Sequence, residues 1–398
     1  MSPPVAPSAA PLRQDWMREH NLSLALSAVL DAVEPISRAQ VAARTGLSRA
    51  AVTNLVDRLV ETGLVRELAP VALPRGRPAV PLGPAEHAVA ALGLEVNVDY
   101  LGVRALDLTG EVIAERVVHG DLRGSQPAAV AARLAEVAAE VRTAAVSLGA
   151  RVAGATLALP GLLDSSSVLR TAPNLGWRDL DAAQLLPAAV VDGVVGFTVA
   201  NEADLAARAE VRARIAEESR PGFFYVSGEI GIGGARVLAG ELSAGRHGWA
   251  GEIGHVVVGT SGSRLIRLED VAGQQALLRA AGLPVQARPG ELRAAVERGD
   301  AQALAAVVQA GRALGIALAA VVHISDVDEV VLGGSFAALF DAIAGPVEAA
   351  LAELVVFSDW APVRVTRARA GEYAAMTGAA HTVIDRLVAQ PSRWLKAS

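Results

Sequence analysis

Arginine and amide side chains that suit contacts with nucleic acid gather near the amino end of the chain. Arg49 and Asn54 stand in one helix-forming stretch, and Arg75 and Arg77 flank a single glycine. A guanidinium group can bind phosphate or a guanine edge, and an asparagine amide can bind an adenine edge or a phosphate. Two arginines beside a glycine can lie in a narrow A·T minor groove, where the electrostatic potential is most negative. These residue types predict a reader of double-stranded DNA.

The distribution of charge supports this prediction. The 398-residue chain has a net charge of −6, which taken alone argues against a nucleic-acid binder. Between Arg13 and Val80, however, nine basic residues accompany seven acidic ones, so this segment carries +2 and the rest of the chain carries −8. A basic head on an acidic body is the asymmetry expected of a small DNA-binding module joined to a larger domain.

The elements that would position these side chains form a winged helix-turn-helix. Apolar residues at helical spacing predict a first helix over about 16–33. Ser37 and Gln40 form a capping box before a short second helix, and Ser48 caps a third helix that Gly63 ends. The apolar stripe on the third helix is expected to be buried. The polar side chains of its first turns then remain free to enter the major groove. The predicted DNA contacts are Arg38, Ser48, Arg49, Ala50, Thr53, Asn54, Arg75 and Arg77.

Strand-forming residues at 64–68 and 79–82 enclose a basic Gly/Pro-rich tip and complete the wing. The alternative is a plain helical subdomain in which Arg75–Pro78 form a solvated loop. Cap, turn, apolar stripe, wing and local positive charge agree with one another, and this agreement favours the DNA-binding interpretation.

The amino-acid composition excludes several classes of site and of protein. The sequence has 52% hydrophobic residues and no cysteine, which excludes disulfides, iron–sulfur clusters, thiolate zinc sites and cysteine nucleophiles. No uninterrupted apolar stretch approaches the roughly 20 residues of a membrane helix, and the first residues lack the pattern of a signal peptide. We therefore expect a cytoplasmic protein that does not enter the membrane.

The body shows signs of an internal duplication. Strand, turn and strand follow one another at 91–106 and again at 223–238, roughly 130 residues later, with α/β material after each. Two lobes with a cleft between them are expected. The predicted organisation is a disordered tail at 1–14, a winged helix-turn-helix domain at 15–84, a first lobe at 88–205 and a second lobe at 206–398, whose last helix packs back on the first lobe.

Several short motifs resemble the ROK family, which groups sugar-responsive repressors, uncharacterised reading frames and sugar kinases. The most specific is the Ala-Gly-Glu-Ile-Gly-His string within Gly245–His255. The others are Ala158–Gly161, Pro173–Trp177, Asn201–Ala203, Val331–Gly334 and Gly378–Ala380. The resemblance runs from the head to about Val388. It implies an α/β architecture, the duplicated actin-like (ribonuclease H-like) two-lobed sugar-kinase fold, with a sugar between the lobes and the all-α/winged helix-turn-helix head before them.

The resemblance also implies a set of sugar contacts. A sugar presents neighbouring hydroxyl groups, so its site needs several acceptors and a few donors on rigid elements. Glu252 and His255, three residues apart, suit such a pair of hydroxyls. For any one position the alternative is a surface or capping role. The positions that match the family's sugar contacts are Asn174, Asn201, Glu202, Glu252, His255 and Glu269.

Departures from the family's kinases argue against phosphoryl transfer. Where those kinases place an Asp-x-Gly-Gly-Thr-Lys phosphate loop, this chain has Glu95–Tyr100, which lacks both glycines and adds the charge of Asp99. Glu202 replaces the catalytic aspartate, and a base displaced by about 1 Å can cost ~10²-fold in rate. The second glycine motif carries Glu229 where a small hydroxyl residue is usual, and we expect it to be a structural turn. We expect neither catalysis nor a nucleotide cofactor.

The zinc site that the resemblance implies is also incomplete. His255 is present, but the segment at 259–264 contains no thiol, and a structural zinc needs four ligands. We expect no bound metal.

Together these features predict a sugar-responsive transcriptional regulator of the repressor type, which binds an inverted-repeat operator as a homodimer or tetramer. One alternative is an ATP-dependent sugar kinase with a DNA-binding head. Another is a ligand-blind DNA-binding scaffold that uses the kinase fold only to dimerise. The sequence names neither the sugar nor the sign of its effect on DNA binding.

Overall fold

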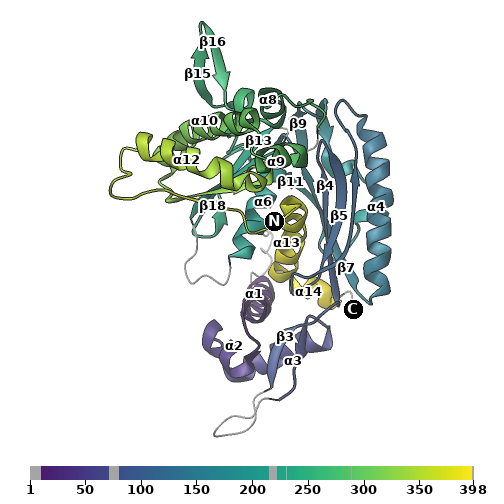
Figure 1. Ribbon diagram of the computed structural model, residues 1–398. Helices are drawn as coiled ribbons and strands as arrows, with labels where there is room; N and C mark the ends of the chain where they lie inside the picture. Colours follow the sequence, from purple (N-terminus) through teal and green to yellow (C-terminus); the bar gives the residue numbers. More distant parts are fainter. Residues whose placement is uncertain (1–9, 71–79, 215–221, 230, 288, 397–398) are drawn as a thin grey trace, which may run out of the picture.

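The computed structural model describes residues 10–70, 80–214, 222–229, 231–287 and 289–396. Within this part of the chain a small head lies against one end of a two-lobed body (Figure 1). The head contains α1 (Ala10–Leu30), β1 (Ile36–Ser37), α2 (Arg38–Thr45), α3 (Arg49–Glu61), β2 (Val65–Glu67) and β3 (Pro81–Pro84). β3 pairs antiparallel with both β1 and β2.

The local signals of α2 and α3 act as predicted, whereas α1 runs from Ala10 to Leu30, so it begins inside the segment expected to be a disordered tail and ends before Val33. The Ser37 side chain accepts the backbone N–H of Gln40, and the Gln40 side chain accepts the backbone N–H of Ser37, which completes the capping box of α2. Gly46 ends α2 with a φ of 71°, a left-handed conformation that favours glycine, and Ser48 caps α3. The apolar stripe of α3 is buried and consists of Val52, Leu55, Val56 and Leu59. The tip of the predicted wing lies outside the described residues.

The first lobe is built on a five-stranded sheet of order β11-β7-β4-β5-β6, with a small sheet of order β10-β9-β8 beside it. α4 packs on β5 and β6 at the outer face of the lobe (Figure 1). The elements are β4 (Val89–Val96), β5 (Tyr100–Leu106), β6 (Val112–His119), α4 (Pro127–Ser147), β7 (Arg151–Leu159), β8 (Leu162–Leu163), β9 (Val168–Ala172), β10 (Trp177–Asp181), η1 (Ala182–Gln184), α5 (Ala188–Val191), β11 (Gly196–Asn201) and α6 (Glu202–Ala213).

The second lobe is built on a five-stranded sheet of order β14-β13-β12-β17-β18. The hairpin of β15 and β16 projects from its far end (Figure 1). The elements are β12 (Phe223–Gly228), β13 (Ile232–Leu238), β14 (Glu241–Leu242), η2 (Ile253–His255), β15 (Val257–Ser261), β16 (Arg264–Arg267), α7 (Glu269–Ala272), α8 (Gln274–Ala280), α9 (Pro289–Glu297), α10 (Ala301–Ser325), β17 (Glu329–Gly333), α11 (Gly334–Ala338), α12 (Phe340–Leu354), β18 (Arg364–Arg367), α13 (Ala374–Ala389) and α14 (Pro391–Lys396).

The strand order of the two large sheets confirms the predicted duplication. In each sheet three antiparallel strands come first, β4-β5-β6 and β12-β13-β14, and two parallel strands then extend the sheet, β7-β11 and β17-β18. Helix α6 follows the last strand of the first sheet, and α13 follows the last strand of the second. These equivalent helices pack against each other between the lobes (Figure 1).

Glycines allow α13 to lie close to both α6 and the first-lobe sheet. A Cβ atom at Gly378 in α13 would lie 1.7 Å from the carbonyl oxygen of Leu205 in α6. A Cβ atom at Gly93 in β4 would lie 1.9 Å from the carbonyl oxygen of Met376 in α13. Any side chain at either position would push α13 away, so these glycines fix how the lobes meet.

Among the described residues, α10 is the one helix long and apolar enough to cross a membrane by length and composition alone. Of its most apolar window, 61% is buried inside the protein. It packs on α12 and on α8, as the core helix of a folded lobe does.

The head and the body share one apolar core. This core contains Leu26 of α1, Val56 of α3, Leu106 of β5 and Ile384 of α13. The C-terminal helix α14 closes it, because Trp394 is 2% exposed and its indole N–H donates to the carbonyl of Thr62 at 3.1 Å. The head is therefore packed directly on the body.

Candidate ligand site and nucleic-acid interface

The N-terminal half of α3 presents polar side chains to solvent. Arg49, Ala50, Thr53 and Asn54 are exposed, on the face opposite the buried stripe. The Ser48 hydroxyl accepts the backbone N–H of Ala51 at 3.2 Å, so Ser48 serves as the helix cap. The amino end of a helix carries partial positive charge and attracts phosphate. This surface has the chemistry and shape of a helix that enters the major groove.

Arg38 differs from the other predicted DNA contacts. Its guanidinium donates to Asp57 of α3 and to Glu67 of β2, both at 2.6 Å, and its side chain is 26% exposed. Arg38 therefore ties α2 to α3 and β2. The sequence could not reveal this role, because the partners lie 19 and 29 residues away. Arg75 and Arg77 lie outside the described residues.

Asn201 and Glu202 form the start of α6, where the last strand of the first sheet ends. Asn201 Oδ1 accepts the backbone N–H of Ala203 at 2.7 Å, and Asn201 Nδ2 donates to the carbonyl of Gly161 at 3.0 Å. The amide therefore caps the helix and anchors it to the Pro-Gly turn after β7. Asn97 Nδ2 donates to Glu202 Oε2 at 3.4 Å. Glu202 thus faces the turn between β4 and β5.

Asn174 faces the glycine loop between β12 and β13 of the second lobe. It is exposed, and its Nδ2 would lie 3.4 Å from a Cβ atom at Gly231. The Cβ atom of Ala203 in α6 would lie 3.1 Å from a Cβ atom at Gly233. The glycine loop therefore lies against the first-lobe residues that the sequence selects as ligand contacts, and bulkier residues in it would separate the lobes.

The loop Gly245–His255 bridges the two lobes. The indole N–H of Trp249 donates to the carbonyl of Leu163 in β8 at 2.9 Å. Gly251 has a φ of 100°, and a Cβ atom there would lie 1.8 Å from the carbonyl oxygen of Gly234 in β13. Only glycine fits this approach. These contacts hold the loop in place and determine where Glu252 and His255, the predicted sugar contacts, lie.

Glu252, His255 and Glu269 come together near the base of the β15–β16 hairpin. Glu252 and His255 are exposed. His255 Nδ1 lies 3.6 Å from Glu269 Oε1, and Arg267 Nη1 lies 3.1 Å from the same oxygen. Partial desolvation of its carboxyl group raises the pKa of Glu252, the charge of His255 lowers that pKa and the charge of Glu269 raises it. These three residues form the second-lobe part of the predicted sugar site.

Four carboxyl groups, which we call the acidic cluster, lie where the lobes meet: Glu95, Asp99, Glu202 and Glu229. Burial raises the pKa of Glu95 to about 7 and that of Glu229 to about 8, and the charges of Glu95 and Asp99 add to the shift of Glu229. Burial also raises the pKa of Glu202 well above its ordinary value, and Glu95, Glu229 and Glu252 contribute in that order. Glu202 therefore interacts electrostatically both with the other members of the acidic cluster and with Glu252.

Sequence reasoning treated Glu95 and Glu229 only as signs of a lost nucleotide site. In the structure both belong to one cluster, although 134 positions separate them. The Glu229 carboxylate lies against the start of α11, since Oε1 would be 2.6 Å from a Cβ atom at Gly334. The signal that could have found the pair is an acidic residue at the end of β4 or directly after β12, the first strands of the two repeats.

The residues around His255 do not fit the family's zinc site. The sequence has no cysteine, and Arg267 Nη1 lies 3.2 Å from His255 Nδ1, where it would repel a cation. Across the described residues, one group brings three ligand atoms within 4.8 Å of one another: His87, Asp107 and Glu111. The Asp107 carboxylate there already accepts the backbone N–H groups of His87 and Thr109. This group is a hydrogen-bonded turn.

Known protein families match both the head and the body of the chain. Residues 23–71 match the model of the MarR family, and residues 91–386 match that of the ROK family. In overall structure the chain resembles a crystal structure described as a ROK family transcriptional regulator, homologue of the E. coli MLC protein. The TM-score is 0.77 at 24% identity, over 96% of this chain and 100% of the other. This likeness confirms the fold.

The curated relatives include repressors and a kinase. The xylose repressor of Bacillus spizizenii is 28% identical over 251 residues, which cover 63% of this chain and 64% of that protein. A putative xylose repressor of a Caldicellulosiruptor species is 26% identical over 94% of this chain and 98% of its own. The kanosamine kinase of Amycolatopsis mediterranei is 30% identical over 62% of this chain and 82% of its own. Because the match at 91–386 spans most of the sequence, this chain belongs to the ROK family.

Proposed function

We propose that this protein is a sugar-responsive, DNA-binding transcriptional regulator of the repressor type, which acts in the cytoplasm. The observation that carries the proposal is the exposed N-terminal half of α3, on a head that shares one apolar core with a two-lobed body. The MarR family match of the head and the relatives described as xylose repressors support the same function.

DNA would be read by the head of each subunit in a homodimer or a tetramer. Arg49, Thr53 and Asn54 would enter the major groove from the exposed side of α3. Arg75 and Arg77 of the wing would lie in the adjacent minor groove. Two heads related by twofold symmetry fit an inverted repeat whose half-sites lie about one helical turn, ~34 Å, apart.

The sugar would bind where the lobes meet. Asn174 and Glu202 would contact it from the first lobe, and Glu252 and His255 from the second, with Glu269 beside them. These groups offer the mixture of acceptors and donors that neighbouring hydroxyls need. Asn201 is committed to capping α6, and it would position Glu202 at the edge of the ligand.

The same region is unfavourable for ATP as a co-substrate. Asp99 follows β4 and Glu229 follows β12, in the two turns that would cradle phosphates, and Glu95 lies at the end of β4. The turn after β4 lacks the glycines that let backbone N–H groups approach a phosphate, and the Asp99 carboxylate repels a triphosphate. We therefore propose that the protein does not phosphorylate its sugar. A sugar kinase is the second candidate, because Glu202 stands where a catalytic base would act and one relative is described as a kanosamine kinase.

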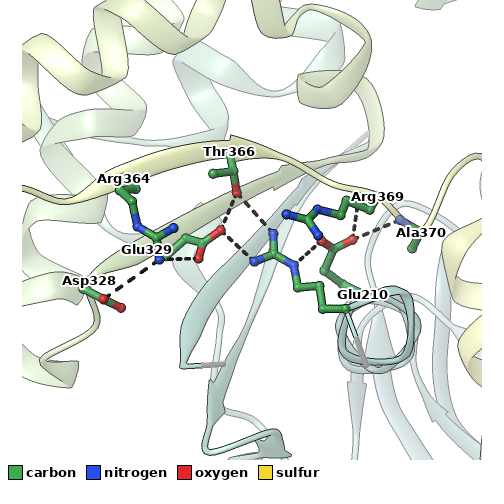
Figure 2. A network of polar contacts seen from close by, with 8 residues as sticks. Glu210, Asp328, Glu329, Arg364, Thr366, Arg369 and Ala370 are labelled. Carbon is green, nitrogen blue, oxygen red and sulfur yellow. Dashed lines mark hydrogen bonds and ion pairs between the residues drawn. The ribbon is translucent and has the colours of Figure 1, made fainter. Parts of the chain in front are cut away.

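Helix α6 gives a physical route from the sugar to the head. Near its carboxyl end the side chain of Arg214 is 1% exposed and donates to Glu210 at 2.6 Å and to Glu329 of β17 at 2.7 Å. Figure 2 shows this network, in which Thr366 of β18 also bonds Glu329. The end of α6 is therefore fixed to the second lobe, although the helix follows a first-lobe strand.

Because Asn201 anchors the start of α6 to the first lobe and Arg214 fixes its end to the second, a sugar that draws the lobes together would tilt α6. Arg212 of α6 contacts Asp31 of α1 in the head at 3.2 Å, so this movement would reach the DNA-binding surface. Such hinge coupling links two distinct sites through a rigid helix.

A gel-shift assay with the full-length protein and the DNA upstream of its own gene tests the proposal. We expect a specific complex that one sugar of a panel weakens or strengthens, and that Arg49→Ala weakens. The kinase candidate predicts instead that ATP and a sugar give a sugar phosphate, and that Glu202→Gln abolishes this product. Failure to form any specific complex, with or without sugars, would contradict the proposed function.

A further inference from the structure

A cavity of about 350 Å³ lies at the joint where the head meets both lobes of the body. The head contributes the end of α1, and the first lobe contributes the turn after β5 and the end of α6. The second lobe contributes the segment after β18 and one face of α13. Small-molecule sites usually have volumes of about 300–1,000 Å³, so this cavity is large enough for a compact ligand.

The cavity is separate from the proposed sugar site. The six predicted sugar contacts, all among the described residues, lie outside its lining. Helix α6 connects the two places, since Glu202 begins the helix and Arg212 near its end lines the cavity. A ligand in the cavity would therefore act at the joint itself and not where the lobes meet around Glu202.

The lining combines apolar side chains with an excess of positive charge. The apolar part comes from Leu30, Leu108, Ile384 and Val388. Arg212 and Arg369 are the basic residues of the lining, and Asp31 is its acidic residue. Burial lowers the pKa of His381 to about 4, and the charge of Arg212 contributes, so this imidazole is neutral at pH 7. Two arginines and one aspartate give the lining a net charge of +1, which suits an anion with an apolar body.

An ion pair in the lining shows how a carboxylate binds there. Arg212 Nη1 lies 3.2 Å from Asp31 Oδ1, and the same guanidinium pairs with Asp385 through Nη2. The side chain of Asp31 is 49% exposed and that of Arg212 is 29% exposed, so solutes can reach the pair. Ion pairs exposed to this degree contribute little to stability. A carboxylate from solution can therefore replace that of Asp31 at small cost.

We propose that the cavity binds a small aliphatic carboxylate, which replaces Asp31 as the partner of Arg212. The hydrocarbon part of the ligand packs on Leu30, Leu108 and Ile384, where it leaves water. The exchange removes the contact between Arg212 of the body and Asp31 of the head. The cavity is thus a second effector site, which acts on the head without the sugar.

Isothermal titration calorimetry of the full-length protein, without DNA or sugar, tests the site directly. The probes are butyrate, hexanoate and cyclohexanecarboxylate at pH 7, each compared with its neutral amide. We expect at least one carboxylate to bind with a Kd of about 1 mM or lower, and about 10-fold or more tightly than its amide, because only the carboxylate forms a charge-assisted hydrogen bond. Absence of binding by all three carboxylates would overturn the proposal.

Two substitutions assign the binding to the cavity. Asp31→Asn removes the competing charge, so the best carboxylate should bind about threefold or more tightly. Arg212→Gln removes the partner, and the same ligand should bind about 10-fold or more weakly. Glu136→Gln and Arg133→Gln, which break an exposed ion pair on α4, are the matched controls and should change neither value.

Thermal unfolding of each variant checks that it is folded. If Arg212→Gln does not fold, the tighter binding expected of Asp31→Asn still decides the matter, because Asp31 lies at the surface. Carboxylate binding that neither substitution alters would overturn the assignment to the cavity.

Fluorescence anisotropy of labelled operator tests the effect on the head, a step that rests on the proposed DNA-binding function. The best carboxylate should shift the operator Kd, and Asp31→Asn should shift it in the same direction without ligand. The carboxylate should have little further effect on that variant. A ligand that binds the cavity but leaves the operator Kd unchanged would overturn the effector role. Since no sugar enters these measurements, a failure of the sugar response is distinguishable from a failure of this site.

Discussion

The guanidinium of Arg212 contacts the carboxylate of Asp31 at 3.2 Å and joins the body helix α6 to the head helix α1. The same guanidinium pairs with Asp385 of α13, which Arg208 also contacts at 2.8 Å. Glu202 begins α6 ten residues earlier, about 15 Å along the helix. A single stiff element therefore connects the proposed sugar site to the proposed DNA reader.

Removal of this connection should uncouple the two sites. In Arg212→Ala we expect the effector to bind with nearly unchanged affinity, while its effect on operator affinity falls to less than half in free-energy terms. Calorimetry measures the first quantity, and fluorescence anisotropy of labelled operator measures the second. Arg133→Ala, which removes an exposed ion pair on α4, is the matched control. A full response in Arg212→Ala would show that the signal travels by another route.

Base contacts on α3 should decide operator affinity. Arg49→Ala and Asn54→Ala should each weaken specific operator binding by ~1–3 kcal/mol, because each side chain can bind a base edge or a phosphate. Binding to DNA of unrelated sequence should change much less for Asn54→Ala if the amide reads a base. Equal loss on specific and unrelated DNA would assign Asn54 to a phosphate instead.

The second-lobe residues should control the response and leave DNA binding intact. Glu252→Ala and His255→Ala should abolish the effect of the sugar on operator binding, since both side chains are exposed where the lobes meet. Operator affinity without sugar should stay within about twofold of the parent protein, a difference of less than ~0.5 kcal/mol. Loss of DNA binding with a preserved sugar response would reverse the assignment of the two sites.

The acidic cluster should make stability depend on pH. Burial raises the pKa of Glu229 from 4.5 to about 8. Between these values the folded protein holds a proton that the unfolded chain releases, so stability falls as pH rises from 4.5 and levels off above about 8. Glu229→Gln removes this dependence and should raise Tm relative to the parent by several degrees at pH 8.5 but little at pH 5. Equal shifts at both pH values would show that Glu229 does not titrate in this range.

The buried ion network at the end of α6 should contribute strongly to folding. Arg214→Ala leaves Glu210 and Glu329 buried without their common partner, which should cost about 3–5 kcal/mol. Chemical denaturation measures the loss, and Arg133→Ala should change the stability by less than about 0.5 kcal/mol. A small effect of Arg214→Ala would mean that water or a neighbouring group replaces the guanidinium.

The head was predictable because its signals are local. The capping box of Ser37 and Gln40, the turn at Gly46 and the cap at Ser48 each act within a few residues, and tertiary packing does not override them. The duplicated fold was predictable because two similar strand–turn–strand segments repeat in the sequence.

Side-chain partners distant in sequence were not predictable. Arg38 is a plausible phosphate contact by position, but Asp57 and Glu67 engage it across the fold. Glu229 looked like part of a structural turn, and its place beside Glu95 and Glu202 depends on how the lobes meet. The Arg212–Asp31 contact joins residues 181 positions apart. No local sequence pattern predicts a contact between residues so far apart.

The central claim is that sugar bound between the lobes changes DNA binding by the head without phosphoryl transfer. The most direct measurement is the operator Kd, by fluorescence anisotropy with and without each sugar, while the same samples with ATP are assayed for sugar phosphate. We predict that one sugar shifts the operator Kd by about 5- to 150-fold, the range of typical allosteric coupling, and that no sugar phosphate forms. An unchanged Kd with every sugar, together with steady conversion of ATP and sugar to a sugar phosphate, would contradict the claim.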